Sequence, residues 1–588
     1  MQFAGNRALF IALFFLCLGI LRLCGETIPL IGPPVEARTV FPFSVEKVIH
    51  PVVGQLPSPD FVEEIVSIPM AISSPSALAS KHVLQGLAHI QAAWDFEAYR
   101  HFCEALKLDP DCLMAYWGIG LSLAAPNNEF TQQRQVAVLR MIELIDATRD
   151  VNGRQLPIAT KMEQDYALAL AELFRLRGKV GEAFKKLSET YPGNLQSQCL
   201  AIYLQRDGYD RFGPRAKQAL AIEQMEELVE ANPDNVAVLG FWVMLHGEAP
   251  EATTKLREKI LPVVRKIARK VPNFPPYQHL LGHFEWRCGN HALAEAALER
   301  AAGLYAEHKK NHDLSVHECD GWIRSQLYLA TAMQSRGKFE EAMSIAVQLS
   351  ELEVDSARLG SKGASLLVWE AKTLPARLYV ARGKEGDFTR AISSLPGKND
   401  PFLEEIKERT LSVFYLECLM QYLECRQALE NGESDIAQQK ALALSGIQER
   451  MERLKTQALK SASISEYVRA LAGVKVYAAE ARGLVALAQA TSGSQRQIAR
   501  SWFKTAVDKQ QRPALLMPPV VLSPMELRLA QYYLAAEDNE KAVESFQSAI
   551  RRRPNDLQSL LGYCDSLRAS GREKEAVQVE AVISAVKE

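Results

Sequence analysis

Apolar and polar residues follow one another along most of the chain with the spacing of amphipathic helices. From about residue 77 onward, apolar positions recur every three or four residues in stretches of about 12 to 20 residues that are rich in Ala, Leu, Glu and Lys. Strand-like patterns are nearly absent, so an all-α fold is predicted. Residues 26–76 are rich in Pro and lack this periodicity, and we expect them to form an extended leader that packs along the following helices.

The first two predicted helices carry small and aromatic residues at fixed intervals. Gly86 is followed by Ala98, Phe102, Ala105 and Pro110. Small side chains at such positions let two helices cross closely, and the proline ends the second helix. Gly120 comes one full period of 34 residues after Gly86, which predicts that the unit repeats.

The same spacing returns near the carboxyl end, at Ala530, Tyr533, Ala542, Phe546, Ala549 and Pro554. Four further turns share a glycine that is followed five residues later by alanine: Gly178/Ala183, Gly289/Ala294, Gly337/Ala342 and Gly571/Ala576. We expect each glycine to end the first helix of a pair in the left-handed conformation, and each alanine to lie where the two helices cross.

These spacings resemble the tetratricopeptide repeat (TPR). The resemblance implies an all-α fold, an α-solenoid of antiparallel helix pairs that forms a right-handed superhelix. It divides the chain into a TPR array at residues 77–350, degenerate or lengthened helical repeats at 351–520 and C-terminal TPR pairs at 521–588.

The amino-terminal residues 1–25 are predicted to be a signal peptide or a short anchor. Arg7 precedes an uninterrupted apolar run from Ala8 to Leu21, which is too short to span a bilayer comfortably but suits a secretory signal. Cleavage is the favoured interpretation, and lipidation at Cys24 or an uncleaved anchor stays open. The sequence therefore predicts an exported protein, periplasmic or secreted, which could meet a membrane only through its N-terminus.

Composition narrows the choice of partner. The formal net charge is −2, which argues against electrostatic binding to nucleic acid, because such proteins need a basic excess. Hydrophobic residues make up 48% of the chain, enough for an ordered fold. The cysteines after residue 25 form no C-x-x-C pair and are predicted to be buried free thiols.

No motif for a catalytic nucleophile or a nucleotide is present, but the histidines cluster. The sequence has no G-x-S-x-G, no G-x-G-x-x-G after a strand, and no Gly-Lys followed by Ser or Thr. Six histidines lie within residues 279–317: His279, His283, His291, His308, His312 and His317. His279 and His283 are four apart on one predicted helix face, and His317 and Asp320 are three apart. These four side chains are a plausible ligand set for Zn or Fe if neighbouring repeats bring them together.

The same four residues resemble a motif of exported bacterial TPR proteins, in which H-x-P-S-H is followed by H-A-L-D-Y. His279 and His283 match the first motif, although Leu281-Gly282 replace Pro-Ser, and His317 and Asp320 match the second. The resemblance implies a shared surface and names no reaction.

The sequence thus predicts a non-enzymatic scaffold that binds a protein or peptide in its concave groove, with no cofactor and no catalytic residue. The candidate contact residues are Tyr99, Trp117, His279, His283 and His317. The alternative is a metal-binding protein or metal-dependent enzyme that uses His279, His283, His317 and Asp320.

Overall fold

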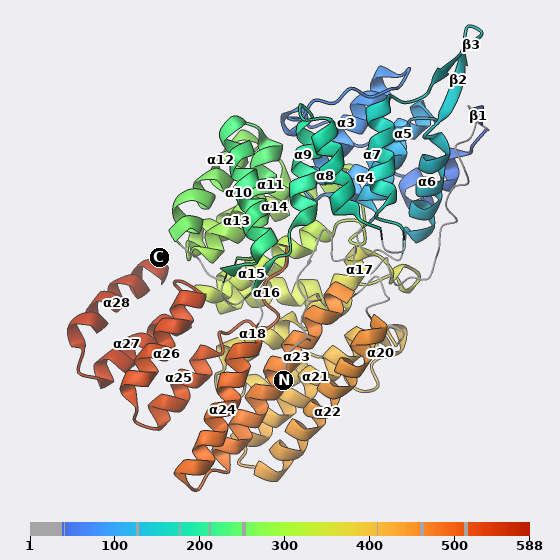
Figure 1. Cartoon of the computed structure of the whole chain (residues 1–588). Coiled ribbons are helices and arrows are strands. Elements are labelled where there is room, and N and C mark those ends of the chain that lie inside the picture. The colour runs from blue at the N-terminus through green and yellow to red at the C-terminus, as the bar shows by residue number, and fades with distance from the viewer. Residues whose placement is uncertain are drawn as a thin grey trace, which may run out of the picture.

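The computed structural model describes residues 38–39, 42–124, 129–175, 178–210, 213–249, 254–407, 410–458, 464–510 and 516–587. The predicted signal or anchor at residues 1–25 lies outside these ranges. The described chain is a solenoid of antiparallel helix pairs, with α3–α14 in the upper part of Figure 1 and α18–α28 in the lower part. None of the described helices is long and apolar enough to cross a membrane.

The first part of the solenoid consists of helix pairs that follow one another in chain order. Its helices are α3 (Ala77–Gln91), α4 (Asp95–Leu108), α5 (Leu113–Ser122), α6 (Thr131–Leu144), α7 (Lys161–Ala171), α8 (Val180–Thr190), α9 (Leu195–Gln205), α10 (Ala216–Ala231), α11 (Val236–His246), α12 (Leu261–Lys270), α13 (Pro275–Arg287), α14 (His291–Asn311), α15 (Asp320–Ser335) and α16 (Phe339–Ser350). A π-helical turn, η3 (Leu256–Ile260), runs directly into α12.

Longer helices form the next part, where the sequence predicts degenerate or lengthened repeats. The elements are η4 (Ser356–Arg358), α17 (Lys362–Leu366), the π-helical η5 (Leu367–Ala371), α18 (Leu374–Arg382), α19 (Asp387–Ser393), α20 (Pro401–Glu405), α21 (Thr410–Glu430), α22 (Ser434–Ala458), α23 (Ile464–Ala488) and α24 (Gly493–Lys509). The chain ends with α25 (Glu526–Ala535), α26 (Asn539–Arg552), α27 (Leu557–Ala569) and α28 (Glu573–Lys587).

One turn geometry joins the two helices of many pairs. Gly289, Gly337 and Gly571 have φ of +83°, +81° and +73°, as the sequence predicts. In each turn the amide that follows the glycine donates to a carbonyl five residues earlier, as Asn290 does to Glu285, which is the hydrogen bond of a Schellman motif. The alanine five residues after each of these glycines is fully buried in the crossing.

The prediction for Gly178 was wrong, because its φ is not positive. A Cβ on Gly178 would lie 1.7 Å from the carbonyl oxygen of Glu172, so glycine is required there for a close backbone approach instead. Among the described residues, three turns of the left-handed type lack glycine, at Ala93, Asp313 and Glu537, with φ of +59°, +53° and +57°. A further turn that the prediction missed has Gly432 at φ of +76°.

Glycines in the first helices make room for an aromatic ring of the second helix. A Cβ on Gly86 or on Gly118 would lie 2.6 Å or 2.2 Å from the ring of Phe102, which is fully buried between α3 and α5. Gly562 stands in the same relation to Phe546 in the C-terminal pairs, at 2.3 Å. The small residues of the predicted repeat therefore set how closely neighbouring helices approach.

Short strands interrupt the helices, which the sequence pattern did not predict. β2 (Ala147–Val151) and β3 (Arg154–Pro157) form an antiparallel hairpin, and β1 (Arg38–Thr39) pairs parallel to β2. Asn152 and Gly153 both have positive φ in the hairpin turn. Asn-Gly is the preferred pair for such a turn, so a signal for it was present in the sequence. A second small sheet joins β4 (Tyr209–Asp210) to β5 (Gly213–Pro214).

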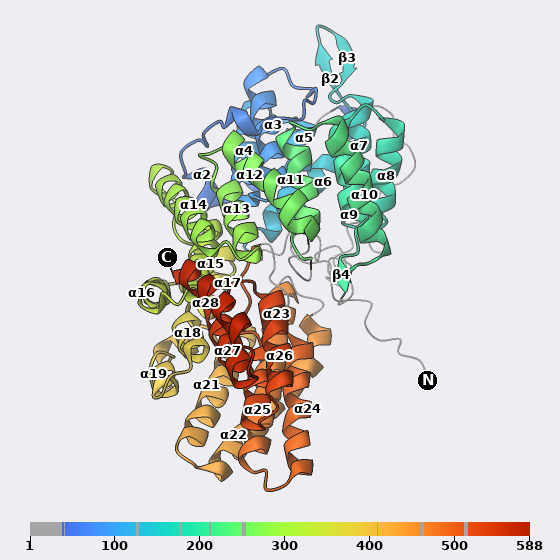
Figure 2. The ribbon, with the colours of Figure 1, turned by 90° about the vertical axis from the view of Figure 1, so that its left-hand side faces the viewer.

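The helices α3–α14, called here the first array, curve so that α14 packs against the start of α4. Trp94, at the start of α4, packs against Phe274, Tyr305 and His308, with ring centroids 5.5, 5.4 and 4.8 Å apart. Lys362, at the start of α17, also forms an ion pair of 2.9 Å with Asp95. Figure 2 shows α4, α13 and α14 side by side.

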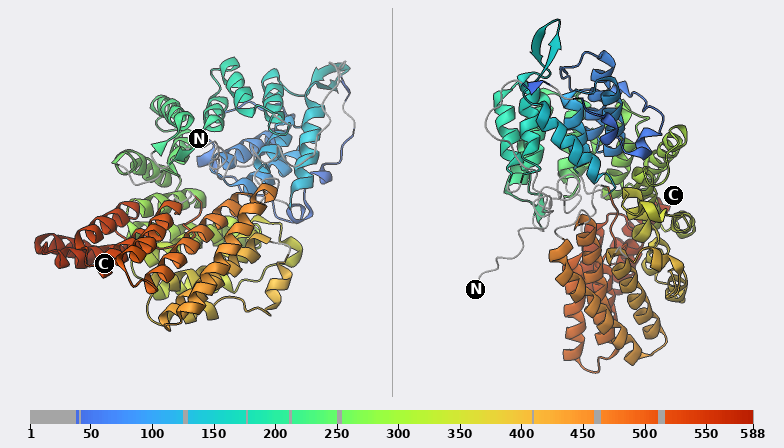
Figure 3. Two further views of the ribbon diagram at one scale, coloured as in Figure 1. Left: turned by 60° about the horizontal axis from the view of Figure 1, so that its bottom comes forward. Right: turned by 90° about the vertical axis from the view of Figure 1, so that its right-hand side faces the viewer.

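The C-terminal pairs dock back onto the turns of the middle repeats. His291 Nε2 lies 3.0 Å from the carbonyl oxygen of Pro554, and Asn555 Nδ2 donates to the carbonyl oxygen of Gly289 at 3.0 Å. Arg336 Nε donates to the carbonyl oxygen of Val586 at 3.2 Å. In Figure 3, the red C-terminal helices accordingly lie against the green helices of the middle of the chain.

Candidate functional site

His279 and His283 lie on one face of α13, as the sequence predicts, and that face packs against α15. His279 Nδ1 is 3.0 Å from Ser325 Oγ, and His283 Nδ1 is 2.9 Å from Tyr328 Oη. Tyr328 Oη donates to the carbonyl oxygen of Met517 at 2.9 Å, so it accepts a hydrogen bond from His283. Burial holds the pKa of His283 well below its ordinary value. The pair therefore joins two helices in the interior.

His317 and Asp320 line a different feature, a small pocket between the starts of α4, α15 and α17. His317 Nε2 accepts from the backbone amide of Asp355 at 3.1 Å. Burial, together with the nearby Arg358, lowers the pKa of His317. Asp320 is paired with Arg324 at 2.8 Å. The pocket also contains Asp95, Glu129, Glu318 and Lys362. Lys362 pairs with Asp95, and both glutamates pair with Arg358.

The structure does not assemble the proposed metal ligands. Within the described ranges, no group of three or more His, Cys, Asp or Glu side chains is arranged to hold a metal ion. His279 and His283 bond to Ser325 and Tyr328, whereas Asp320 bonds to Arg324. The eight described cysteines are all free and buried, which confirms the prediction for the thiols.

The expectation that five candidate residues line an open groove needs correction. Tyr99, Trp117 and His283 are fully buried, and His279 and His317 are 4% and 8% exposed. Packing between neighbouring helices buries these side chains, and Tyr99 also bonds to the leader at Val48 and His50. Trp117, for example, donates from Nε1 to the carbonyl oxygen of Tyr166 at 3.0 Å.

Residues 42–74 of the leader, called here the leader segment, lie along the first array and are bound through their backbone. Tyr99 Oη donates to the carbonyl oxygen of Val48 at 2.7 Å and accepts from the amide of His50 at 2.9 Å. Gln85 forms two hydrogen bonds with the backbone of Val62, accepting from its amide at 3.1 Å and donating to its carbonyl oxygen at 2.9 Å. Tyr99 is thus a peptide-contacting residue whose peptide belongs to the same chain.

More side chains of the array continue this pattern along the leader segment. Arg100 donates to the carbonyl oxygen of Pro57 at 2.8 Å, and Asn235 donates to that of Ser67 at 2.7 Å. Glu163 accepts from the amide of Ser73 at 2.8 Å. These bonds reach main-chain atoms, whereas Ser67 Oγ accepts from the amide of Ala237 at 3.0 Å and Ser74 Oγ donates to Asp109 at 2.7 Å. The array therefore contacts both the backbone and the side chains of the leader segment.

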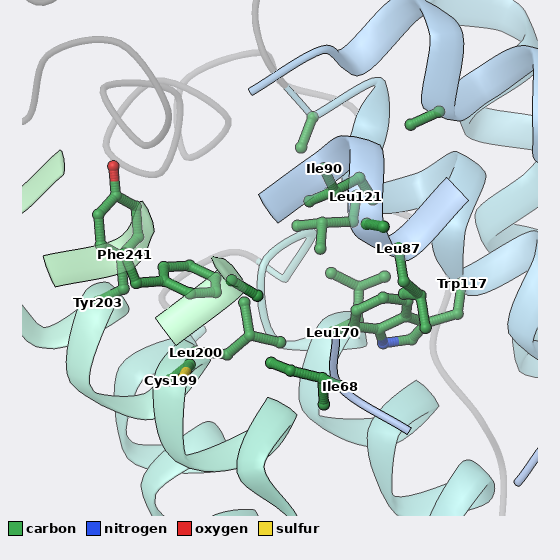
Figure 4. Packing of buried hydrophobic residues seen from close by; sticks show 14 of the residues in the cluster. Ile68, Leu87, Ile90, Trp117, Leu121, Leu170, Cys199, Leu200, Tyr203 and Phe241 are labelled. Carbon is green, nitrogen blue, oxygen red and sulfur yellow. The ribbon is translucent and has the colours of Figure 1, made fainter. Parts of the chain in front are cut away.

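Apolar side chains of the leader segment supply the hydrophobic part of the contact. Val48, Val53, Ile65, Ile68 and Met70 are each less than 10% exposed. Ile68 belongs to the same buried cluster as Leu170 and Leu200, and Figure 4 shows these side chains together beneath α3 and α5. Each such side chain stabilises the contact by about 1.5 to 3 kcal/mol at most.

The residues that hold the leader segment include several that the sequence reasoning missed. Gln85, Arg100, Glu163 and Asn235 are not part of the repeat spacing. Gln85 offers one signal, because it is a polar residue within the otherwise apolar run of α3, and it is fully buried. Asn235 is also the N-cap of α11, so its second role could not be read from the sequence.

Comparison with protein families gives one match. Residues 527–556 match the model of the tetratricopeptide repeat. These residues are therefore similar to a tetratricopeptide repeat. The matched residues are α25, α26 and the turn that follows, and they include the turn at Glu537 and the ring of Phe546 described above. No curated protein matches the chain.

Solved structures resemble the chain only loosely. The human IFIT1 dimer with PPP-AAAA has 12% identity and a TM-score of 0.32, with 92% of this chain and 98% of that chain covered. The human IFIT1 dimer with m7Gppp-AAAA has 12% identity and a TM-score of 0.30, with coverage of 92% and 99%. Yeast Tom70 has 11% identity and a TM-score of 0.23, with coverage of 84% and 89%.

Proposed function

We propose that the protein is an exported, non-enzymatic interaction scaffold whose first helical array binds an extended segment of a partner protein. The observation that carries the proposal is the leader segment, an irregular stretch with the short helical turns η1 (Val45–Lys47), α2 (Pro51–Gly54) and η2 (Glu63–Ile65), which the array already holds through bonds to its backbone. Backbone-directed bonds from Tyr99, Arg100 and Gln85 give the array a general means of binding a main chain. The array needs no metal or cofactor for this role.

The leader segment also indicates the chemistry of the partner. Its buried side chains at Ile65, Ile68 and Met70 are spaced three and two residues apart, and Ser67 and Ser73 bond through their backbone. A partner segment that competes for the same surface would carry aliphatic residues at this spacing and small polar residues between them. The near-zero net charge of the chain does not select a strongly charged partner.

The test converts the leader segment into a separable ligand. A seven-residue protease site is inserted after Pro75, which is exposed and precedes the N-cap of α3. After cleavage, a fluorescent synthetic peptide of residues 42–75 is added, and its binding is followed by fluorescence anisotropy. We expect the peptide to replace the cleaved leader, and a peptide of the same composition in shuffled order to fail.

A matched pair of variants checks the recognition. Gln85→Ala removes two hydrogen bonds to the peptide backbone and is expected to weaken binding by about tenfold or more. Gln497→Ala makes the same change at an exposed position of α24 and is expected to leave the affinity unchanged. Equal binding of the shuffled peptide, or no binding of residues 42–75, would refute the proposal.

The proposed export has a test of its own. Residues 1–25 are expected to direct the chain out of the cytoplasm, so cell fractionation of the full chain and of a variant without these residues compares the two locations. Mass spectrometry of the exported protein then identifies its N-terminus. Recovery of the full chain in the cytoplasm alone would contradict the proposal.

A further inference from the structure

Five histidines meet where α14 returns to the start of the array and the leader segment crosses this junction. They are His82 and His89 on α3, His101 on α4, His308 on α14 and His312 directly after α14, and together they are called the histidine latch. The rings of His89 and His101 are 4.9 Å apart, and those of His308 and His312 are 4.3 Å apart. The latch therefore joins segments that are more than 200 residues apart in the chain.

The hydrogen bonds of His312 require a neutral ring. Arg100 Nη2 lies 3.3 Å from His312 Nδ1, and a guanidinium can only donate, so this nitrogen must accept. His312 Nε2, 3.1 Å from Asp60 Oδ2, then carries the hydrogen and donates to the carboxylate. The neutral imidazole thus connects the leader segment to α4. A proton on Nδ1 would place two positive groups face to face.

A second contact in the latch has the same requirement. His82 Nδ1 and His101 Nδ1 are 3.0 Å apart, so one ring donates and the other accepts. If both rings were protonated, two N–H groups would point at each other in a buried site. Phe61 of the leader segment covers this pair, with its ring centroid 4.6 Å from that of His82 and 5.8 Å from that of His101.

The charged groups around the latch do not compensate for added protons. The groups that face it are Asp60 from the leader segment, Lys81 from α3, Glu97, Arg100, Glu104 and Lys107 from α4, and the five histidines themselves. Glu97 is the buried carboxylate, and it is already paired with Arg100 at 2.8 Å and close to His308 at 3.2 Å. Burial lowers the pKa of His82, His101 and His312, and lowers that of His89 to about 4.

We propose that the histidine latch is an acid-sensitive lock, which holds the leader segment and the end of α14 on the array at neutral pH and releases them when its histidines are protonated. Release would uncover the surface of the array that the leader segment contacts. That consequence for partner binding rests on the proposed function, whereas the release itself does not. Regions without a histidine cluster, such as α21 and α22, stay folded at the pH of release.

The experiment measures hydrogen exchange of the full chain by mass spectrometry at pH 7.0 and 4.5, with labelling times scaled for the intrinsic rate at each pH. Residues 48–66 and 303–314 are expected to exchange at least tenfold faster at pH 4.5 after this scaling, while residues 410–458 change less than twofold. Equal acceleration in all three regions would mean global acid unfolding and would overturn the proposal.

Variants separate the latch from other buried histidines. His312→Gln can still accept from Arg100 and donate to Asp60 but does not titrate, so release is expected to shift to lower pH by about half a unit or more. His312→Lys carries a permanent charge and is expected to release the leader segment already at pH 7.0. His291→Gln alters a buried histidine far from the latch, in the C-terminal docking contact, and leaves the pH of release unchanged.

Unchanged release in both His312 variants would overturn the latch. The peptide-exchange assay described above keeps the two proposals distinguishable. If the leader segment is released at pH 4.5 but the peptide of residues 42–75 never binds the cleaved protein at neutral pH, the lock stands and the proposed function fails. If the peptide binds but hydrogen exchange is insensitive to pH, the proposed function stands and the acid-sensitive lock fails.

Discussion

Gly289 is where two structural demands coincide, and alanine at this position tests both. Its φ of +83° is unfavourable for a residue with a Cβ. A Cβ would also lie 2.9 Å from both Cβ and the carbonyl oxygen of Pro554. Because two of the three nearest atoms are backbone atoms, they cannot turn away, and the docking of the C-terminal pairs must loosen.

The magnitude follows from comparison with Gly571, which has φ of +73° and no atom within 4 Å of the place that a Cβ would occupy. Gly571→Ala therefore introduces left-handed strain alone, about 1 to 2 kcal/mol, partly offset by the lower entropy of the unfolded chain. Gly289→Ala adds overpacking of about 1 to 3 kcal/mol. We expect Gly289→Ala to lower the free energy of opening of the C-terminal pairs by about 2 kcal/mol more than Gly571→Ala does.

Native-state hydrogen exchange of residues 539–587 measures the effect where it is expected. A difference of about 2 kcal/mol corresponds to an opening equilibrium about 30-fold larger in Gly289→Ala than in Gly571→Ala. Exchange in α3 and α4 serves as the internal control and is expected to stay unchanged in both variants. If the two variants show equal acceleration in the C-terminal pairs, the docking of Pro554 on Gly289 does not stabilise them, and the reasoning is wrong.

Three further predictions concern the core, the pH dependence and the metal. Phe102→Ala leaves a cavity between two helices and is expected to lower the free energy of unfolding of the first array by about 3 to 5 kcal/mol, as measured by urea denaturation. Burial lowers the pKa of His89 and of His291 to about 4, below the value of about 6.5 in the unfolded chain. Between these two pKa values the unfolded chain binds more protons than the folded chain. The free energy of unfolding is therefore expected to fall as the pH falls from about 6.5 to about 4, by up to about 1.4 kcal/mol per pH unit for each group. His291→Gln should flatten the dependence of the urea midpoint of the C-terminal pairs on pH over that range. Elemental analysis of the untagged protein is expected to find no stoichiometric Zn or Fe, and stoichiometric metal that disappears in His279→Ala and His283→Ala would restore the metal-binding alternative.

Much of the fold could be predicted from the sequence because the repeat is local. The glycine turns and the alanine crossings depend on residues within about 20 positions of each other, as at Gly86 and Phe102. The glycine spacing cannot identify turns that lack glycine. Ala93 and Glu537 adopt the same left-handed conformation, held by the hydrogen bonds of the turn rather than by a residue that prefers it.

The site could be predicted only in outline. The Pro-rich pattern indicated an extended leader that packs along the helices. The described residues 42–74 contact α3, α4, α7 and α11, but they include the helical turns η1, α2 and η2. The residues that hold it could not be identified, because their proximity depends on how far the array curves. Asn235 bonds to Ser67 across 168 residues, and His312 bonds to Asp60 across 252 residues. Of the predicted contact residues, Tyr99 bonds to the leader, whereas His279 and His283 are buried between α13 and α15.

The return of α14 to α4 also sets an order of events while the chain is being made. Arg100 meets His312 across 212 residues, so a ribosome needs roughly 10 to 40 s to supply the second partner after the first. During this interval the leader segment has its contacts with Tyr99 and Gln85 but lacks those with α14 and, for much of the time, with α11. The amino-terminal part of the molecule therefore reaches its final structure late, after the middle of the chain has emerged.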